Sequence, residues 1–283
     1  IVEVLKDYGF IMQDDDYYMA TQLGKKISEL YLNPDTANYF LENIDKFVKA
    51  YENYSSQKYL EFSLINFIVN TMEMRPLFRV TKSEEEKYVS RIEELGDSLI
   101  VGFDPFEVDY ENFMNSIKTT DILIDWIQEA PEDYISDKYK ITPGELNYKV
   151  EVVDWLLYCL EELAYIRKNV YFKNMLNKLR VRFKFGVKQE LLPLVNLKGI
   201  GRVRARKLYN AGFKKLFDLK RAEHAQVARV VGDKTTIKIK EQVSGGESVS
   251  SDLKIPIEGS KYERPEHPRS LGKPKEIKVR EVS

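Results

Sequence analysis

The sequence is poor in the residues that build disulfides, zinc clusters and catalytic triads. It contains one cysteine, Cys159, and two histidines, His224 and His267. A single cysteine cannot form an intrachain disulfide, which fits a reducing, cytoplasmic setting. Zinc sites and nucleophile–histidine–acid triads need more of these residues than the chain has. We expect no metal site and no catalytic residue, and we expect the acidic runs Asp14–Asp16 and Glu84–Glu86 to be solvated.

Three other features are also missing from the sequence. There is no G-x-x-x-x-G-K-[ST] sequence, the loop that holds nucleotide phosphates in many ATPases. No apolar run is long enough to cross a bilayer, and no signal peptide opens the sequence, so we expect no membrane partner. The first residue, Ile1, lies inside the periodic segment IVEVLKDYGFI, which is typical of the tail of a helix. We therefore expect a fragment whose N-terminal part is missing.

The net charge is close to zero, but the charges are unevenly distributed. The chain carries 44 basic and 45 acidic side chains. Residues 1–172 hold 17 basic and 33 acidic residues, residues 173–221 hold 15 and 2, and residues 222–283 hold 12 and 10. A strongly basic segment indicates a polyanion, such as nucleic acid, as its partner. Composition leaves an alternative equally open, in which the acidic and basic parts neutralise each other within the fold.

Hydrophobic periodicity predicts a mainly α-helical chain in four parts. These are a partial winged helix at 1–34, a multi-helix bundle at 35–185, a helix-hairpin-helix domain at 186–229 and a flexible tail at 230–283. The first part shows a helix, two short strands and a second helix that Thr21 opens, which is the order of the back half of a winged helix. The tail is rich in Ser, Gly, Pro and Lys and permits at most a short strand near Ile237–Lys240.

Two segments of the bundle are distinctive. YLEFSLINFIVNTME is apolar on almost every side and should be buried, and Ser83 with Glu86 predicts a capping box before the next helix. A long helix at about 145–168 carries two apolar stripes on nearly opposite sides. The first stripe comprises Leu146, Val150, Val153, Leu157, Leu160 and Ala164, and the second comprises Tyr148, Val152, Trp155 and Cys159. Such a helix lies at the centre of a bundle or presents one side to a ligand.

The second stripe leaves two interpretations open for its tryptophan. Aromatic rings stack on unpaired bases with about 1–3 kcal/mol each, so Trp155 could contact a single strand. Spacing alone favours a core position for Trp155, and the same holds for Trp126.

The segment ELLPLVNLKGIGRVRARKLYNAGF predicts a helix, a tight turn and a second helix. Gly199 and Gly201 allow positive φ and leave the backbone uncovered. Arg202 begins the second helix, on which Arg206 lies four residues later, and Lys198, Arg204 and Lys207 flank them. Free amides at a helix start bind phosphate oxygens, and neighbouring cations add a salt-dependent attraction. The pattern is that of a helix-hairpin-helix motif that contacts the nucleic-acid backbone, and the alternative is a helical turn with a solvated basic face.

Over residues 1–222 the chain resembles the C-terminal half of the archaeal Hjm/HELQ-type DNA-repair helicases of superfamily 2. The resemblance rests on ATQLGKKISELYLNPDTA, NTMEM, the segment from DILIDWIQ to EELA and, most specifically, GIGRVRARKLYNAG, which follow in the family's order. It implies an ATP-dependent 3′ to 5′ DNA helicase that acts on stalled forks and recombination intermediates. Its two motor domains, with ATP and Mg²⁺, would lie upstream of this chain, which would bind no cofactor itself.

The resemblance also implies roles for particular residues. In the family, one helix of a "ratchet" bundle runs along the single strand and stacks a base between an arginine and a tryptophan. The tryptophan falls on Trp155, whereas the arginine falls on Tyr148, which either removes a contact or supplies a second aromatic ring. The family's terminal arginine motif falls on Arg204–Arg206 and would hold the emerging strand. We expect single-stranded and branched DNA as partners and a monomeric state.

Two functional hypotheses follow. In the first, the chain is the DNA-handling half of such a helicase. In the second, it is a helical module without a motor that binds nucleic acid or a protein. ATPase motifs encoded upstream of Ile1 would favour the first, and an initiator codon just upstream would favour the second.

Overall fold

The computed structural model describes residues 1–15, 17–53, 57–101 and 109–244 of the chain, except for the side chains at 53, 57, 58 and 97. These residues form fourteen α-helices, four 3₁₀ helices and one two-stranded sheet, which confirms the mainly α-helical prediction. The chain divides into two compact units, at 1–248 and 249–283, and the second lies outside the described residues. The part of the predicted tail beyond residue 244 also lies outside the described residues. None of the described helices is long and apolar enough to span a membrane.

The N-terminal part has the predicted order of helix, hairpin and helix. It consists of α1 (Val2–Asp7), β1 (Ile11–Asp14), β2 (Tyr17–Ala20) and α2 (Gln22–Leu30). Thr21 caps α2 by accepting a hydrogen bond from the Gly24 amide, and its hydroxyl also donates to the carbonyl of Gly9. A Cβ atom at Gly24 would lie 1.9 Å from the carbonyl oxygen of Phe10, so only glycine lets α2 approach the hairpin this closely.

In the residues that the structure describes, the bundle contains seven α-helices and three short 3₁₀ helices. They are α3 (Pro34–Asn53), α4 (Gln57–Val69), η1 (Met72–Met74), η2 (Lys82–Glu84), α5 (Glu85–Leu95), η3 (Gly96–Ser98), α6 (Tyr110–Ile127), α7 (Glu132–Tyr139), α8 (Pro143–Ile166) and α9 (Val170–Phe185). From Leu60 to Val69, α4 is buried except at Glu61, as its apolar sequence predicts. One hydrophobic core cluster contains residues of α2, α3, α4, α6, α7, α8 and α9. A smaller cluster contains residues of α4, α5 and α6.

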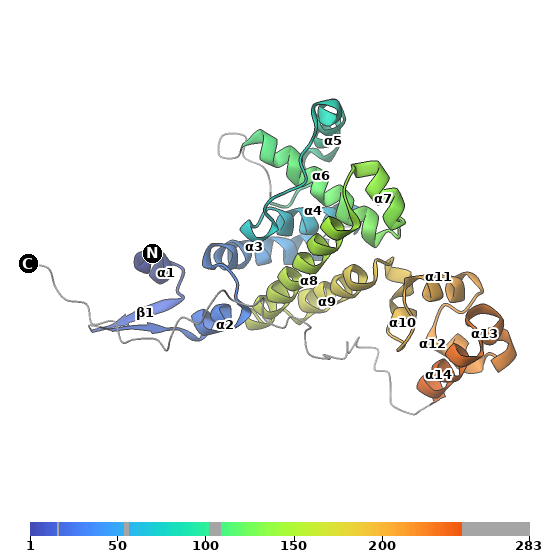
Figure 1. Ribbon diagram of the computed structural model, residues 1–283. Coiled ribbons are helices and arrows are strands. Elements are labelled where there is room, and N and C mark those ends of the chain that lie inside the picture. Colours follow the sequence, from blue (N-terminus) through green and yellow to red (C-terminus); the bar gives the residue numbers. More distant parts are fainter. Residues whose placement is uncertain (16, 54–56, 102–108, 245–283) are drawn as a thin grey trace, which may run out of the picture. The chain divides into compact units, whose positions relative to one another are not determined.

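Helix α8 is central to this bundle and packs along α9 (Figure 1). Its start is fixed by a capping box, in which the Thr142 hydroxyl accepts from the Glu145 amide and Glu145 accepts from the Thr142 amide. All residues of the first predicted stripe are buried. The second stripe is graded, because Cys159 is buried, Val152 and Trp155 are half-buried, and Tyr148 is 54% exposed.

The predicted capping box at Ser83 and Glu86 is wrong. The box forms two residues earlier, where Glu84 accepts hydrogen bonds from the amide and the hydroxyl of Thr81. Glu84 is not solvated either, because its carboxylate lies 2.7 Å from the ammonium of Lys118, a side chain that is only 4% exposed. Burial of the Lys118 ammonium is offset by its pairing with the Glu84 carboxylate. The sequence pattern did not reveal this pair.

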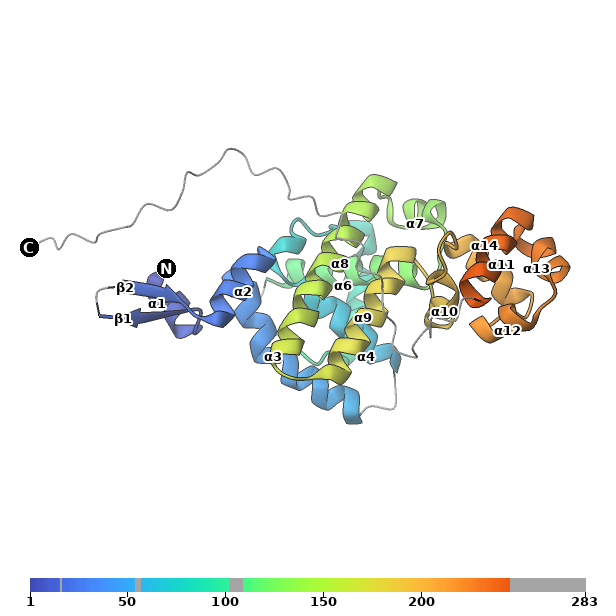
Figure 2. The ribbon, with the colours of Figure 1, turned by 90° about the horizontal axis from the view of Figure 1, so that it is seen from below.

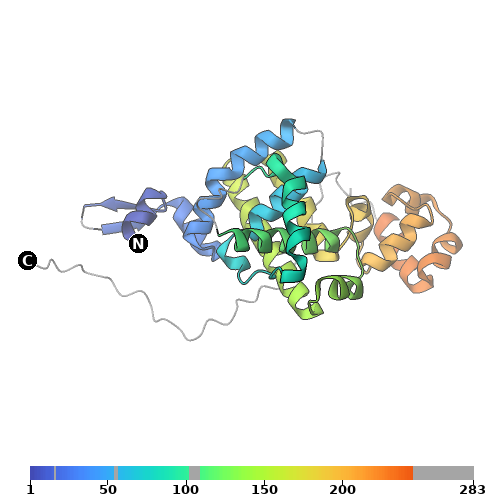
Figure 3. The ribbon, with the colours of Figure 1, turned by 90° about the horizontal axis from the view of Figure 1, so that it is seen from above.

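The C-terminal domain forms a small cluster of helices (Figures 2 and 3), in which apolar side chains such as Leu194, Leu208 and Leu219 are buried. It contains η4 (Gln189–Leu191), α10 (Leu192–Val195), α11 (Arg202–Asn210), α12 (Leu216–Arg221), α13 (His224–Val231) and α14 (Asp233–Ser244). Residues 233–244, predicted as the start of a flexible tail with at most a short strand, instead form α14. Burial of Thr236 and Ile239 at helical spacing favours this helix. The alternation of isoleucine and lysine permits a short strand at most, but this segment is helical.

Candidate nucleic-acid interface

The turn between α10 and α11 is exposed and held by the residues beside it. Lys198, Gly199 and Gly201 are exposed, whereas the flanking side chains of Leu197 and Ile200 are buried and anchor the turn in the domain core. Gly199 has φ +82°, a conformation that favours glycine. The turn predicted from KGIG therefore forms, and its backbone faces solvent.

The turn presents several backbone donors together with cations. In the described part of the chain, the amides of Gly199 and Gly201 have no hydrogen-bond partner, and no side chain caps the start of α11. Arg204 is exposed, and its Nη1 donates to the Gly199 carbonyl at 2.8 Å, which braces the turn. Lys198 and Lys207 are exposed as well. Free amides at a helix start beside cations can bind an anion such as a phosphate.

A glutamine from α14 fixes the base of this turn. The side-chain oxygen of Gln242 accepts from the Lys198 amide at 2.8 Å, and its side-chain nitrogen donates to the Lys198 carbonyl at 3.3 Å. This pairing uses both backbone groups of Lys198, so the Lys198 amide is not available to a ligand. No local pattern predicts this contact, since the two residues are 44 positions apart.

Arg202 turns away from the exposed turn and contacts the end of α6. Its Nη2 donates to the carbonyl of Ala130 at 2.7 Å, and its guanidinium lies 5.4 Å from the centre of the Trp126 ring. Burial lowers the pKa of Arg202. The Trp126 indole is buried and donates to the Phe183 carbonyl at 2.8 Å, so the predicted core position of Trp126 is confirmed.

Arg206 is paired with two carboxylates. Its Nε and Nη2 donate to Glu129 at 2.8 and 2.6 Å, and its Nη1 lies 2.8 Å from Glu190. Burial alone would raise the pKa of Glu129, but hydrogen bonds from Arg206 and from the Lys188 amide outweigh it and lower the pKa. Glu129 was not recognised from the sequence, because it precedes Arg206 by 77 residues.

The basic segment is partly neutralised by carboxylates within the fold. Within the described residues, three of the fifteen basic side chains of 173–221 form ion pairs with carboxylates: Arg180 with Asp154 and Glu161, Arg182 with Glu61, and Arg206 with Glu129 and Glu190. The other twelve do not, and they include the cations around the turn. Internal neutralisation is limited to a few arginines.

Helix α14 offers an internal comparison with α11. Thr236 and Ile239 are buried three and six positions after the start of α14, as Ala205 and Leu208 are in α11. The outward positions differ: Asp233, Thr235 and Ile237 occupy the places of Arg202, Arg204 and Arg206 in the helix. A carboxylate at the start of α14 repels phosphate, so of these two helices α11 has the phosphate-binding pattern.

The face of α8 holds the two other residues predicted to contact DNA. Tyr148 and Trp155 are seven residues apart and therefore share a side of the helix. Tyr148 projects into solvent, with the ammonium of Lys149 5.5 Å from its ring centre. Trp155 is half-buried, and its indole donates to the Leu30 carbonyl at 3.2 Å. The structure thus places Trp155 partly in the core and partly at the surface, and its role stays a prediction.

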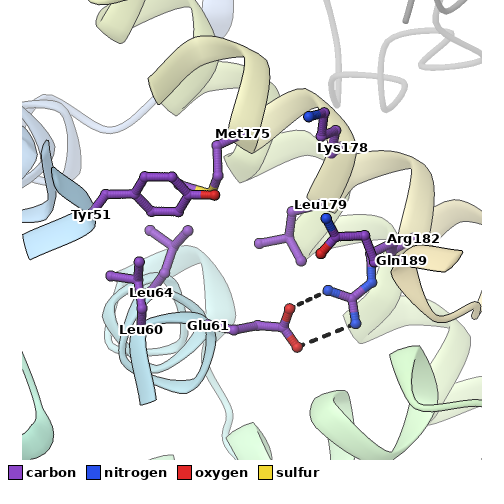
Figure 4. Close-up of a pocket in the computed structure, with 9 residues that line it drawn as sticks. All are labelled: Tyr51, Leu60, Glu61, Leu64, Met175, Lys178, Leu179, Arg182 and Gln189. Carbon is purple, nitrogen blue, oxygen red and sulfur yellow. Dashed lines mark hydrogen bonds and ion pairs between the residues drawn. The ribbon is translucent and has the colours of Figure 1, made fainter. Parts of the chain in front are cut away.

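A small pocket lies between α3, α4, α9 and η4 (Figure 4). Its lining residues are Tyr51, Leu60, Glu61, Leu64, Met175, Lys178, Leu179, Arg182 and Gln189. Glu61 and Arg182 form an ion pair there, and the Nε of Arg182 donates to the Val187 carbonyl. The pair joins α4 and α9 to the start of the C-terminal domain. Among the residues that the structure describes, no group of three His, Cys, Asp or Glu side chains could hold a metal ion.

Comparisons with known proteins agree with this architecture. A family model described as "Archaeal helicase, domain 4" matches residues 62–186, and one described as "SAM-like Helix-hairpin-helix tandem" matches residues 191–244. The ATP-dependent DNA helicase Hel308 of Methanocaldococcus jannaschii is 34% identical over 244 residues, which are 86% of this chain and 18% of that protein. The Hel308 of Caldivirga maquilingensis is 35% identical over 256 residues, 86% of this chain and 32% of that protein.

The helical bundle and the hairpin domain together define a region of a helicase. The chain belongs to the archaeal Hel308/Hjm-type helicases and corresponds to the C-terminal part of such a protein. It spans 18% and 32% of the length of the two relatives named above. The second family match ends at residue 244, where α14 ends, so α13 and α14 belong to the hairpin domain.

Proposed function

We propose that this chain is the DNA-handling region of an ATP-dependent 3′ to 5′ DNA helicase that acts on forks and recombination intermediates. In this proposal ATP and Mg²⁺ bind to motor domains outside the present sequence. The chain itself contacts single-stranded and branched DNA as part of a monomeric, cytoplasmic protein. The main support is the exposed turn at Lys198–Gly201, where unpaired amides lie beside the cations of Lys198, Arg204 and Lys207.

The experiment that tests this contact is a salt titration of DNA binding. We would measure the affinity of the chain for a fluorescent single strand between about 50 and 200 mM salt. The logarithm of the binding constant should fall linearly with the logarithm of salt concentration. Arg204→Gln should weaken binding and reduce the slope by about one, as the loss of one phosphate contact does. Lys82→Gln, at an exposed lysine of η2 in the bundle, is the charge-matched control. Binding that does not weaken as salt rises would refute the proposal.

We propose further that the single strand runs along α8 and stacks on Tyr148 and Trp155. The exposed ring of Tyr148 and the partly exposed indole of Trp155, on one side of one helix, support this. Tyr148→Ala should weaken single-strand binding by roughly fivefold or more, and Tyr148→Phe, which keeps the ring, should not. In the full-length parent, Trp155→Ala should lower unwinding more than ATP hydrolysis. An equal loss of both activities would count against a role in moving the strand.

The relationship to Hel308 favours the helicase hypothesis over the module without a motor. Sequencing the coding DNA upstream of Ile1 tests it directly. DExH and P-loop motifs there would support the proposal, and an initiator codon just upstream of Ile1 would contradict it.

A further inference from the structure

The arginines of α11 do not share one role. We infer that Arg202 and Arg206 hold the hairpin domain against the end of α6, that Glu129 is the positioning residue for this docking, and that Arg204 is the arginine that faces DNA. This inference rests on the proposed DNA-binding function of the hairpin, and it separates residues that the sequence presents as one basic cluster.

Glu129 lies at an unusual place for a glutamate. It follows the end of α6 with φ +69°, and its amide and that of Ala130 donate back to Trp126 and Asp125. This left-handed position after a helix is normally filled by glycine or asparagine. A residue in such a conformation is held by its surroundings, and Tyr31, Lys140 and Lys168 take it at other helix ends of this chain, so the side-chain contacts must define its task.

The contacts of the Glu129 side chain show what that task is. Its carboxylate accepts from the Lys188 amide at 2.9 Å and from two nitrogens of Arg206. Lys188 lies just after Gly186, where α9 ends, and Arg206 lies on α11. One carboxylate, with a side chain only 12% exposed, therefore fixes both the linker to the hairpin domain and the helix that carries the arginines. The paired geometry with Arg206 fixes orientation as well as distance.

Arg202 completes the docking. It donates to the Ala130 carbonyl and stacks over Trp126, so it uses a backbone carbonyl next to Glu129 and a ring of α6 itself. A cation at this end of α6 is also favoured by the helix dipole. A phosphate could reach Arg206 only by displacing Glu129 and Glu190, whereas Arg204 is exposed and bound only to the turn that it braces.

The direction in which one substitution changes the affinity for single-stranded DNA distinguishes docking from DNA contact. If Arg206 docks the domain, Glu129→Gln should weaken single-strand binding, because the hairpin is no longer held in place. If Arg206 contacts phosphate, Glu129→Gln should strengthen binding, because it frees the guanidinium. Glu86→Gln, at an exposed carboxylate of α5, is the matched control.

We would therefore measure DNA affinity and its salt slope for Glu129→Gln, Arg206→Gln, their double variant and Arg204→Gln in the 283-residue chain. We expect the first two to weaken binding by a similar factor, roughly three- to tenfold, and the double variant to be no weaker than either. Arg204→Gln should reduce the salt slope by about one. Tighter binding by Glu129→Gln would overturn the inference.

Trypsin supplies a readout of docking that does not involve DNA. Cleavage after Lys188, measured as the rate at which fragment 1–188 appears, should rise several-fold in Glu129→Gln and Arg206→Gln and stay unchanged in Arg204→Gln. Unchanged cleavage in Glu129→Gln would overturn the inference even if DNA still binds. If instead the chain binds no DNA, Arg204→Gln has nothing to weaken and the proposed function fails, whatever the cleavage pattern.

Discussion

Three glycines on or near the hairpin domain allow the close contact between the end of α9 and Trp126 to be measured by itself. Gly186 ends α9 with φ +61°, and a Cβ atom there would lie 2.8 Å from two carbons of the Trp126 ring. Gly199 has φ +82° with no atom within 4 Å of such a Cβ, and Gly201 has an ordinary φ and open space as well. Alanine at Gly186 therefore imposes both backbone strain and a steric clash. Alanine at Gly199 imposes backbone strain alone, and alanine at Gly201 imposes neither.

The expected losses of stability follow from these differences. A left-handed backbone costs an ordinary residue about 1–2 kcal/mol, and overpacking a core costs about 1–3 kcal/mol. Gly186→Ala should thus lower the free energy of unfolding by about 2–5 kcal/mol, Gly199→Ala by about 1–2 kcal/mol, and Gly201→Ala by well under about 1 kcal/mol. Trp126 is a buried and rigid neighbour, hydrogen-bonded to Phe183, so it cannot move aside cheaply.

The assay is urea unfolding followed by tryptophan fluorescence and by far-ultraviolet circular dichroism. The chain has two tryptophans, and Trp126 itself reports on the contact. Midpoints should shift in the order of the three predicted losses with little change in the slope of the transition. If Gly186→Ala were no more destabilising than Gly199→Ala, the ring would not be tightly packed against the end of α9, and the argument would fail.

Three further outcomes are expected. Because the pKa of Glu129 is lowered below its ordinary value of 4.5, its contribution to stability is complete above 4.5 and is lost as the pH falls through the lower pKa of the folded chain. The difference in unfolding free energy between the native chain and Glu129→Gln should therefore shrink as the pH falls below about 4.5. Gln242→Ala should weaken DNA binding without changing its salt slope, because it frees the Lys198 backbone but removes no cation; a reduced slope would contradict this. Burial raises the pKa of the Cys159 thiol to about 12, so iodoacetamide should label it only after unfolding, and rapid labelling of the folded chain would contradict its burial.

Local sequence patterns predicted most helices but not the ends that depend on distant partners. Thr21 marked the start of its helix correctly, because capping is a property of a few neighbouring residues. The capping box near Ser83 was misplaced by two residues, because Lys118 draws Glu84 into the fold. Helix α14 was missed because its isoleucines alternate with lysines, and its two buried positions have meaning only against the core of the hairpin domain.

The candidate site shows the same limit more sharply. The glycines and cations of the hairpin were apparent from the sequence, since they lie within ten residues of one another. Which cations are free was not apparent, because that depends on Glu129, Glu190 and Ala130. Helical spacing puts Arg202 and Arg206 on one side, and it is this shared side that packs on α6 and leaves Arg204 outside.

This arrangement has a consequence for how DNA binding must be measured. Docking of the hairpin through Arg206 and phosphate binding through Arg204 are both ionic, so added salt weakens both, although it screens the half-buried pair less than the exposed cation. A salt slope measured on the native chain alone would therefore overstate the number of phosphate contacts if docking loosened in the same range. The trypsin cleavage rate after Lys188, followed over that range without DNA, gives the docking contribution separately. Only the part of the salt slope that remains after this contribution is subtracted reports the number of phosphate contacts.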